Sequence, residues 1–428
     1  MIRSLILTTA LLLSACGIPD SPSSDISGEE NQTLIALINV TVIDGTGAEP
    51  VPAQTVLIAD GRIHEVGPAG QVTVPDTALV IDAAGKFVIP GLIDTHVHLA
   101  TDPSGVDNRE AVESMLALAL DRGIVSVRDM AGDARALADL KRDALVFDIH
   151  SPDIYYTALM SGPAFFTDPR THSASAGLAA GETPWLRAVT DDTDLLYAIA
   201  EAKGTGATGI KIYASLGPAE IDRITAEAHQ QNMEVWSHGV IDPAGPRDAV
   251  ASGVDVLSHI SHLRWAAEDS VFSNTDSTFW SLPVSDHRIT EFLDSVLKAG
   301  TMLDPTLLLY IIDPDRPMTA SKHDWVINVT RAAYQAGIVI STGTDTDGEI
   351  ATLDEIFLMV NEVGMSPLDA LTAATLNGAK VIGIENETGS ITVGKYADLV
   401  LLHEDPTVDI SNLQSLFMVI KKGRIVVK

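Results

Sequence analysis

Short apolar runs alternate with amphipathic stretches through the middle of the chain. Eight runs rich in Val, Ile and Leu have the length of buried strands and cover residues 88–93, 124–128, 154–158, 210–213, 235–238, 254–258, 301–304 and 338–342. Helical periodicity appears between several of them, in residues 109–122, 194–203, 218–231, 289–298 and 323–336. This alternation predicts an α/β fold, a (β/α)₈ TIM barrel, in residues 88–385.

The two flanks of this region have the period of strands. Residues 33–87 contain alternating or β-branched runs separated by Gly, Pro and Asp turns, and residues 386–428 contain a matching set. Neither flank has enough strands to bury a face by itself. We therefore expect a small β-sandwich domain that is built from both ends of the chain.

The first residues are not expected to belong to this fold. Arg3 precedes a short apolar run that ends in Leu-Ser-Ala-Cys at residues 13–16. The pattern is typical of a signal peptide, and the tetrad resembles a bacterial lipobox, whose cysteine is lipidated. We expect a lipoprotein signal peptide in residues 1–15, lipidation of Cys16 and a flexible tether in residues 16–32. The expected location is the cell envelope, anchored at the outer membrane or its periplasmic face; an ordinary secretory signal with an incidental cysteine is the alternative.

Composition narrows the possible partners. Hydrophobic residues make up 46% of the 428 residues, which leaves little room for extended disorder. The chain has 27 Lys and Arg against 58 Asp and Glu, and a net charge of -31 repels a phosphate backbone. Nucleic acid is therefore not an expected partner, and a membrane is expected only through the lipid anchor. Cys16 is the single cysteine, so any metal ligands further along the chain carry nitrogen or oxygen donors.

Polar side chains follow the carboxyl ends of the predicted strands, where barrel enzymes place their chemistry. His96 and His98 end the first strand and, as alternate residues, share one face. His238 and His259 close the fifth and sixth strands, as metal-binding imidazoles on a rigid scaffold do. Asp345 follows the last strand, where a carboxylate can contact a metal and accept a proton. The pattern predicts a metal centre at the barrel mouth.

Lys211 lies between two isoleucines in a predicted strand, where a charged ammonium is costly to bury. A lysine kept neutral by burial can react with CO₂, and the resulting carbamate is an anionic oxygen pair that can bridge two cations. The alternative is a lysine that extends to the barrel mouth or pairs with a carboxylate. His262 competes with His259 as a ligand, but it lies past the strand and we assign it to a loop beside the substrate.

Three further features predict the substrate pocket. Arg128, at the end of the second strand, is expected to bind a substrate carboxylate in a bidentate contact, with a structural pair to Asp129 or Asp94 as the alternative. Tyr213 shares the face of Lys211 and is expected to donate to the substrate carbonyl, with simple packing as the alternative. The aromatic-rich connection 264–286 is long and predicts a lid or a pocket wall.

These motifs together resemble the amidohydrolase superfamily with a binuclear metal centre, close to imidazolonepropionase-related and prolidase-like (Xaa-Pro dipeptidase) members. The resemblance covers nearly everything after the tether. It rests on PGLIDTHVHL, the VRD of the second strand, IKIYAS, the histidines that close strands five and six, STGTD, and the C-terminal GSITVGKYADLVLL. Family members often carry His-x-His at strand five, where this chain has Trp-Ser-His at residues 236–238.

The resemblance implies a ligand set and a cofactor. His96, His98 and Asp345 would hold the buried metal, His238 and His259 would hold the exposed one, and N6-carboxylated Lys211 would bridge two divalent ions. Zinc is the default for such donors, and manganese, cobalt or iron fit them as well. A water shared by two such ions is a nucleophile at neutral pH, and Asp345 would accept its proton and pass it to the leaving amine.

The expected function is a metal-dependent hydrolase that cleaves amide (C–N) bonds of small carboxylated substrates. Dipeptides, Xaa-Pro dipeptides among them, and N-acyl amino acids are the candidates. Two enzymatic alternatives are ring opening of a cyclic amide or lactone, and deamination, although deaminases of this superfamily typically use one metal and lack the bridging lysine. A non-catalytic envelope lipoprotein that uses the barrel for binding is the alternative from another class. The sequence leaves the oligomeric state open.

Overall fold

The computed structural model of the protein describes residues 34–102, 108–269, 278–312, 319–346 and 348–428. The predicted signal peptide, the tether and Cys16 lie outside the described residues, as does part of the predicted loop 264–286. Among the residues that are described, no helix has the length and apolar character needed to cross a membrane. Two sheets organise the rest of the chain, and each is described in turn.

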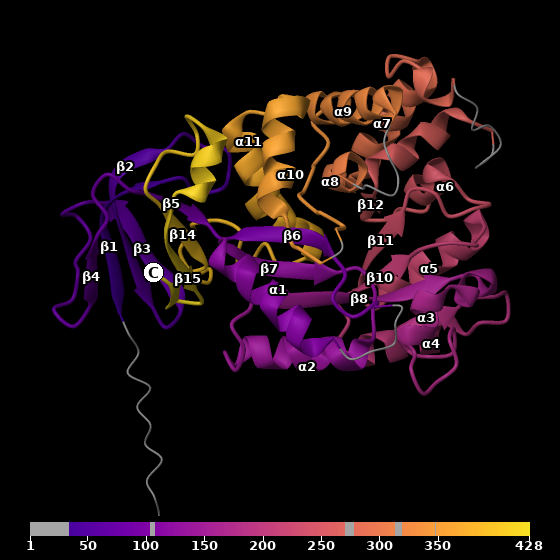
Figure 1. Ribbon diagram of the computed structural model, residues 1–428, viewed down its shortest axis with the longest axis horizontal. Coiled ribbons are helices and arrows are strands. Elements are labelled where there is room, and N and C mark those ends of the chain that lie inside the picture. Colours follow the sequence, from indigo (N-terminus) through magenta and orange to yellow (C-terminus); the bar gives the residue numbers. More distant parts are fainter. Residues whose placement is uncertain (1–33, 103–107, 270–277, 313–318, 347) are drawn as a thin grey trace, which may run out of the picture. The chain divides into compact units, whose positions relative to one another are not determined.

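The first sheet is mixed and uses both ends of the chain. Its order is β16-β15-β14-β5-β1-β2-β3, and β4 pairs with β1 in parallel. Figure 1 shows the indigo strands of the N-terminal part beside the yellow β14 and β15. The strands are β1 (Ile35–Val42), β2 (Val51–Ala59), β3 (Arg62–Pro68), β4 (Leu79–Asp82), β5 (Phe87–Pro90), β14 (Leu399–Leu402), β15 (Leu416–Lys421) and β16 (Arg424–Val427). A β-rich domain built from both ends is thereby confirmed, with its strands in one hydrogen-bonded sheet.

The second sheet is parallel and forms the barrel. Its order is β13-β12-β11-β10-β8-β7-β6, and β9 pairs with β8. The strands are β6 (Leu92–Val97), β7 (Ile124–Asp129), β8 (Asp153–Ser161), β9 (Leu186–Ala188), β10 (Gly209–Ile212), β11 (Glu234–His238), β12 (Val256–Ser258) and β13 (Met302–Asp304). The strand order follows the order in the sequence, as in a TIM barrel, so the predicted fold class is confirmed.

The segment predicted as the eighth strand closes the barrel with few hydrogen bonds. Ile340 forms an isolated parallel bridge to Leu303 of β13. On the other side, the backbone N–H of Thr95 in β6 donates to the carbonyl of Thr342 at 2.9 Å. The segment therefore spans the gap between the last and the first strand and carries Asp345 to the mouth.

One predicted boundary is wrong. The run 88–93 was expected to be the first barrel strand, but Phe87–Pro90 forms β5 of the mixed sheet, and the barrel strand β6 begins at Leu92. Gly91 separates them, and a Cβ atom at this position would collide with the side chain of Val125. The chain therefore passes from one sheet to the other at a glycine that the packing against β7 requires.

Helices surround the barrel strands in the predicted rhythm. They are α1 (Arg109–Asp121), α2 (Ala134–Leu145), α3 (Pro169–Ser173), α4 (Leu195–Gly204), α5 (Pro218–Gln230), α6 (Pro246–Ala251), α7 (His287–Ala299), α8 (Leu307–Ile312), α9 (Ala320–Gln335), α10 (Thr352–Leu358), α11 (Pro367–Thr372) and α12 (Gly378–Ile382). In α7, Asp286 caps the first turn by accepting from the N–H of Arg288 at 2.9 Å, and Gly300 ends the helix with a φ of 74°.

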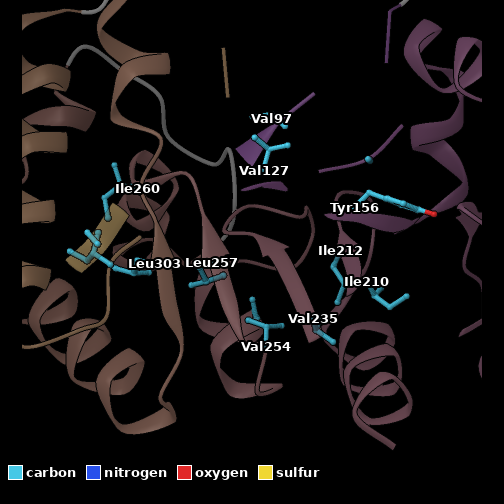
Figure 2. Close-up of a cluster of buried hydrophobic side chains, with 14 of the residues drawn as sticks. Val97, Val127, Tyr156, Ile210, Ile212, Val235, Val254, Leu257, Ile260 and Leu303 are labelled. Atoms are coloured by element: carbon cyan, nitrogen blue, oxygen red, sulfur yellow. The ribbon is translucent and has the colours of Figure 1, made fainter. Parts of the chain in front are cut away.

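Barrel and helices share one large apolar core. The buried residues of α7 recur at helical spacing, at positions 289, 292, 293 and 296, and face that core. Figure 2 shows part of the cluster, with Ile210, Val235 and Leu257 contributed by three neighbouring strands. This packing fixes the strands, so side chains at their carboxyl ends have well-defined positions.

Candidate active site

Three predicted metal ligands meet where the first and last barrel segments join. The N–H of Asp345 donates to the carbonyl of His96 at 2.8 Å, which brings the carboxylate beside the end of β6. Asp345 Oδ1 lies 3.0 Å from His98 Nε2 and 3.6 Å from His96 Nε2. The ligand atoms of these three residues lie within 4.8 Å of one another. They converge on one point, as the shared face of His96 and His98 predicted.

A buried carboxylate that the sequence reasoning did not assign orients His96. Asp304 Oδ2 lies 2.6 Å from His96 Nδ1, and both side chains are almost fully buried. Because a carboxylate only accepts, Nδ1 carries the proton and Nε2 keeps its lone pair toward Asp345. Asp304 ends β13, so its signal in the sequence was a carboxylate at the carboxyl end of a predicted strand. Gly343 leaves room for this pair, since a Cβ atom there would collide with Asp304 and approach His96 at 2.7 Å.

Burial and neighbouring charges shift the pKa values of His96, His98 and Asp345 in different directions. Burial would raise the pKa of Asp345, but His96, His98 and Lys211 outweigh it and hold the pKa below its usual value. Burial is the largest single effect on His98 and would lower its pKa, but the hydrogen bond to Asp345 and the charges of Asp345 and Asp129 together outweigh burial and raise that pKa. For His96 burial dominates and lowers the pKa. The carboxylate is therefore kept ionised next to the imidazoles.

Lys211 lies on β10 with 1% of its surface exposed, as its apolar neighbours predicted. Burial lowers its pKa to about 7, with the Arg128 charge acting in the same direction. Its Nζ donates to Ser258 Oγ at 3.2 Å, and the side chain lines the same cavity as the histidines. An amine with this pKa is partly neutral at physiological pH and therefore nucleophilic.

His238 and His259 form a second pair of facing imidazoles. Their Nε2 atoms lie 3.0 Å apart, and His259 Nδ1 lies 3.0 Å from Thr306 Oγ1 and 3.7 Å from Asp345 Oδ2. Burial lowers the pKa of both rings well below the usual value, and the neighbouring histidines act in the same direction. Two neutral rings that direct nitrogen atoms at one point are suitable ligands for a divalent cation.

The donor set fits a metal site. Convergent imidazole nitrogens and a buried carboxylate are the ligands that zinc and related ions prefer. The orientation of His96 by Asp304 is the arrangement found around metal-bound histidines, where a carboxylate fixes the ring. Among the described residues, His96, His98 and Asp345 have ligand atoms close enough together to hold one metal ion.

The six predicted ligands line one cavity of about 810 Å³. Tyr213 and His262 line it as well, and the Tyr213 ring lies over His238 with the centroids 4.0 Å apart. The size is that of a small-molecule site. Other lining residues were not assigned from the sequence because they lie on short helical segments or in the first turn of a helix, away from the strand ends, namely Phe165, Arg170, Tyr310 and Lys322.

The predicted substrate contact of Arg128 is contradicted by its position. Arg128 is fully buried and is not part of the cavity wall. Its Nε donates to the carbonyl of Thr95 at 2.5 Å, its guanidinium lies 4.2 Å from the centroid of the Trp236 ring, and its Nη2 lies 3.6 Å from Asp304. Burial of a cation costs several kcal/mol, and these contacts offset that cost inside the barrel. Arg128 therefore has a structural role, as the alternative stated, but its partner is Asp304 and not Asp129 or Asp94.

Comparison with known proteins identifies the family of this chain. The model of the amidohydrolase family matches residues 87–426. The ochratoxinase of Aspergillus niger is 26% identical over 421 residues, which cover 87% of this chain and 82% of that protein. The imidazolonepropionase of Symbiobacterium thermophilum is 22% identical over 413 residues, covering 89% and 91% of the two chains. A solved Xaa-Pro dipeptidase with bound methionine has a TM-score of 0.71 and 23% identity, covers 92% of this chain and 99% of its own, and shares the fold. The chain therefore belongs to the amidohydrolase family and is a hydrolase of that superfamily.

Proposed function

We propose that the protein is a metal-dependent hydrolase that cleaves amide (C–N) bonds of small carboxylated substrates, such as dipeptides and N-acyl amino acids. The observation that carries the proposal is that six side chains with metal-binding chemistry line one cavity. They are His96, His98, Lys211, His238, His259 and Asp345. The size of the cavity supports a small substrate rather than a folded protein.

The proposed metal centre is binuclear. His96, His98 and Asp345 would hold one divalent ion, His238 and His259 the other, and N6-carboxylated Lys211 would bridge them. Zinc is the default, with manganese, cobalt or iron as the other candidates. When bound, such ions would supply Lewis-acid polarisation of the scissile carbonyl and lower the pKa of a water. Carboxylation of Lys211 is supported by burial that lowers its pKa to about 7, because the neutral amine can attack CO₂ and lose a proton.

Asp345 is proposed as the general base. Its carboxylate lies between His98 and His259, and its side chain is 15% exposed toward the cavity. It would take the proton of the attacking water and give it to the leaving amine. Tyr213 and His262 are proposed to donate hydrogen bonds to the substrate, because both line the cavity beside His238.

A substrate screen tests this function. Metal-loaded protein would be assayed with dipeptides, N-acyl amino acids, lactones, cyclic amides and aminated bases. We expect hydrolysis of the first two classes and loss of turnover in Lys211→Ala. Activity restricted to lactones or cyclic amides would favour ring opening, the reaction class suggested by the name of the imidazolonepropionase relative. Activity restricted to aminated bases would favour deamination, and inactivity on every class would favour a binding protein.

We also propose that Cys16 is lipidated and anchors the protein to the cell envelope. The proposal rests on the apolar run and the Leu-Ser-Ala-Cys tetrad at residues 13–16. Expression in a bacterial host with radiolabelled palmitate should label the wild type and should not label Cys16→Ser. Label that persists in the variant would contradict the lipid anchor.

A further inference from the structure

One wall of the cavity is aromatic. Trp265 lies on the 3₁₀ turn Ile260–Ala267 after β12, Trp280 on the turn Phe279–Ser281, and Tyr310 on α8 after β13. Trp265 and Trp280 meet edge to face with their centroids 6.0 Å apart, and Phe279 supports both at 4.7 and 5.0 Å. Trp265, Trp280 and Tyr310 are partly exposed and line the cavity. We call these three residues the aromatic wall.

The aromatic wall adjoins the proposed metal ligands. The Trp265 ring lies 6.4 Å from the His262 ring, and the His262 ring lies 5.1 Å from that of His259. Only one side chain therefore separates Trp265 from a proposed ligand. A substrate whose scissile carbonyl reaches the metal centre places the adjacent side chain within reach of this wall.

A cationic side chain lies beside the aromatic wall. Lys322, in the first turn of α9, places its Nζ 4.8 Å from the centroid of Tyr310 and 5.3 Å from that of Trp280. The two rings hold the ammonium at the cavity, since cation–π contacts of this length are attractive. An anionic group bound beside it would be attracted in a partly desolvated setting.

The other cationic side chains of the cavity have different surroundings. Among the described lining residues these are Arg170 and Lys211. Arg170 makes a double contact with Asp168, at 2.8 and 3.1 Å. Lys211 is assigned to the metal centre. Arg170 lies 3.5 Å from the hydroxyl of Tyr213, whereas Lys322 contacts Trp280 and Tyr310, so only Lys322 is placed beside the aromatic wall.

We propose that the aromatic wall and Lys322 form the specificity subsite for the leaving half of the substrate, which is an aromatic amino acid with a free carboxylate. The aromatic side chain would stack on Trp265 and Trp280, and the carboxylate would bind Lys322. The preferred substrates are then N-acyl aromatic amino acids and dipeptides with a C-terminal aromatic residue. This inference rests on the proposed amide hydrolase function and assigns the carboxylate contact that Arg128 cannot make.

Two substrate ratios test the subsite in the wild-type protein. Acetate release would be measured with N-acetyl-L-phenylalanine, its N-methylamide and N-acetyl-L-alanine. We expect kcat/KM for the acid to exceed that for the methylamide by about tenfold or more, the usual effect of a charged hydrogen bond. The phenylalanine substrate should exceed the alanine substrate by about tenfold, because a buried phenyl ring gains apolar contact. A ratio near one in either comparison would overturn the proposal.

Variants then assign each ratio to its residue. Lys322→Met should reduce the acid-to-methylamide ratio to about one, and Lys322→Arg should restore most of it. Trp265→Leu should reduce the phenylalanine-to-alanine ratio and keep the acid-to-methylamide ratio. Lys298→Met, at an exposed position of α7, is the matched control and should keep both ratios. Loss of the acid-to-methylamide ratio in Arg170→Leu, with retention in Lys322→Met, would assign the carboxylate to Arg170 and overturn the proposal.

A binding measurement separates this subsite from the proposed function. If wild-type protein releases no acetate from any of the three compounds, the amide hydrolase function fails. Quenching of tryptophan fluorescence would then compare binding of N-acetyl-L-phenylalanine and N-acetyl-L-alanine to wild type and Lys322→Met. The subsite is supported if wild type binds the phenylalanine compound more tightly than the alanine compound and Lys322→Met binds both compounds more weakly than wild type does. Equal binding of the two compounds to wild type, or undiminished binding to Lys322→Met, overturns it.

Discussion

Asp345 is the residue on which the proposed chemistry depends most, because it contacts His98 at 3.0 Å and opens to the cavity. Asp345→Asn preserves the shape of the side chain but removes its capacity to accept a proton. We expect kcat to fall by about 10²–10⁴, the usual contribution of a general base, with KM changed much less. Steady-state kinetics would measure kcat and KM, and metal analysis of the same samples would show whether the variant keeps its metal. A kcat within a few-fold of wild type would show that Asp345 is not the general base.

Asp304 allows a second prediction at this scale. Its contact with His96 Nδ1 at 2.6 Å fixes the ring and makes Nε2 a stronger ligand. In Asp304→Asn we expect affinity for Zn²⁺ to fall by about 10–100-fold, measured by competition with a chromogenic chelator. Asp398→Asn, a buried carboxylate of the mixed-sheet domain, is the control and should leave the affinity unchanged. Unchanged affinity in Asp304→Asn would show that the contact is only structural.

The placement of the site residues was predictable wherever a strand end fixes them. His96, Lys211, His238 and His259 lie at or beside the carboxyl ends of parallel strands, which meet at one mouth regardless of the loops. Arg128 satisfies the same pattern but turns into the barrel interior, because Trp236 and Asp304 attract it. The orientation of such a side chain depends on partners on strands that are far apart in the sequence, and a single sequence does not show which residues these partners are.

At the scale of elements, the periodic segments were predicted well and the short ones poorly. Residues 289–298 were expected to be helical, and α7 runs from His287 to Ala299 with its four buried positions as the pattern required. The run 88–93 was assigned to a single strand because buried strands of both sheets are built from the same apolar residue types. The packing of Gly91 against Val125 marks the point where β5 ends and β6 begins. Tyr310 and Lys322 lie on α8 and at the start of α9, whose positions depend on the course of the loops.

The opposite end of the barrel strands offers a prediction about pH and stability. Burial and, to a smaller extent, the neighbouring Asp255 together raise the pKa of Glu234, at the start of β11, to about 7. The ordinary pKa of a glutamate, 4.5, applies to this group in the unfolded chain. The folded state therefore holds the proton more tightly, so this contribution to stability is complete below about pH 4.5 and is lost as the pH rises through about 7.

Glu234→Gln removes this dependence on pH. The Tm of the variant should rise relative to wild type between pH 5 and pH 8, because only the wild type loses the stabilising proton. Glu291→Gln, on the exposed face of α7, is the matched control and should show no such trend. Differential scanning calorimetry at several pH values would measure it, and parallel pH profiles of wild type and Glu234→Gln would contradict the shifted pKa.

For the whole molecule, one buried ionic contact ties the mixed sheet to the barrel. Lys421, at the end of β15, is 1% exposed, and its Nζ lies 2.9 Å from Asp153 Oδ1 at the start of β8. Lys422 Nζ lies 2.6 Å from the other oxygen of Asp153. The flanks of the sequence predicted a shared domain by their strand period, but a contact between residues so distant in the chain has no local signal. The last strands therefore help to hold β8 in place.

The proposed binuclear centre is tested most directly by metal titration of chelator-stripped protein. Hydrolysis of an N-acyl amino acid should be absent without metal and return in proportion to added Zn²⁺ until two equivalents are bound. In Lys211→Ala, fewer equivalents should bind and turnover should be lost, with partial rescue by added short carboxylic acids, whereas Lys298→Ala should behave as wild type. Full turnover without metal, or two bound equivalents and full turnover in Lys211→Ala, would contradict the account.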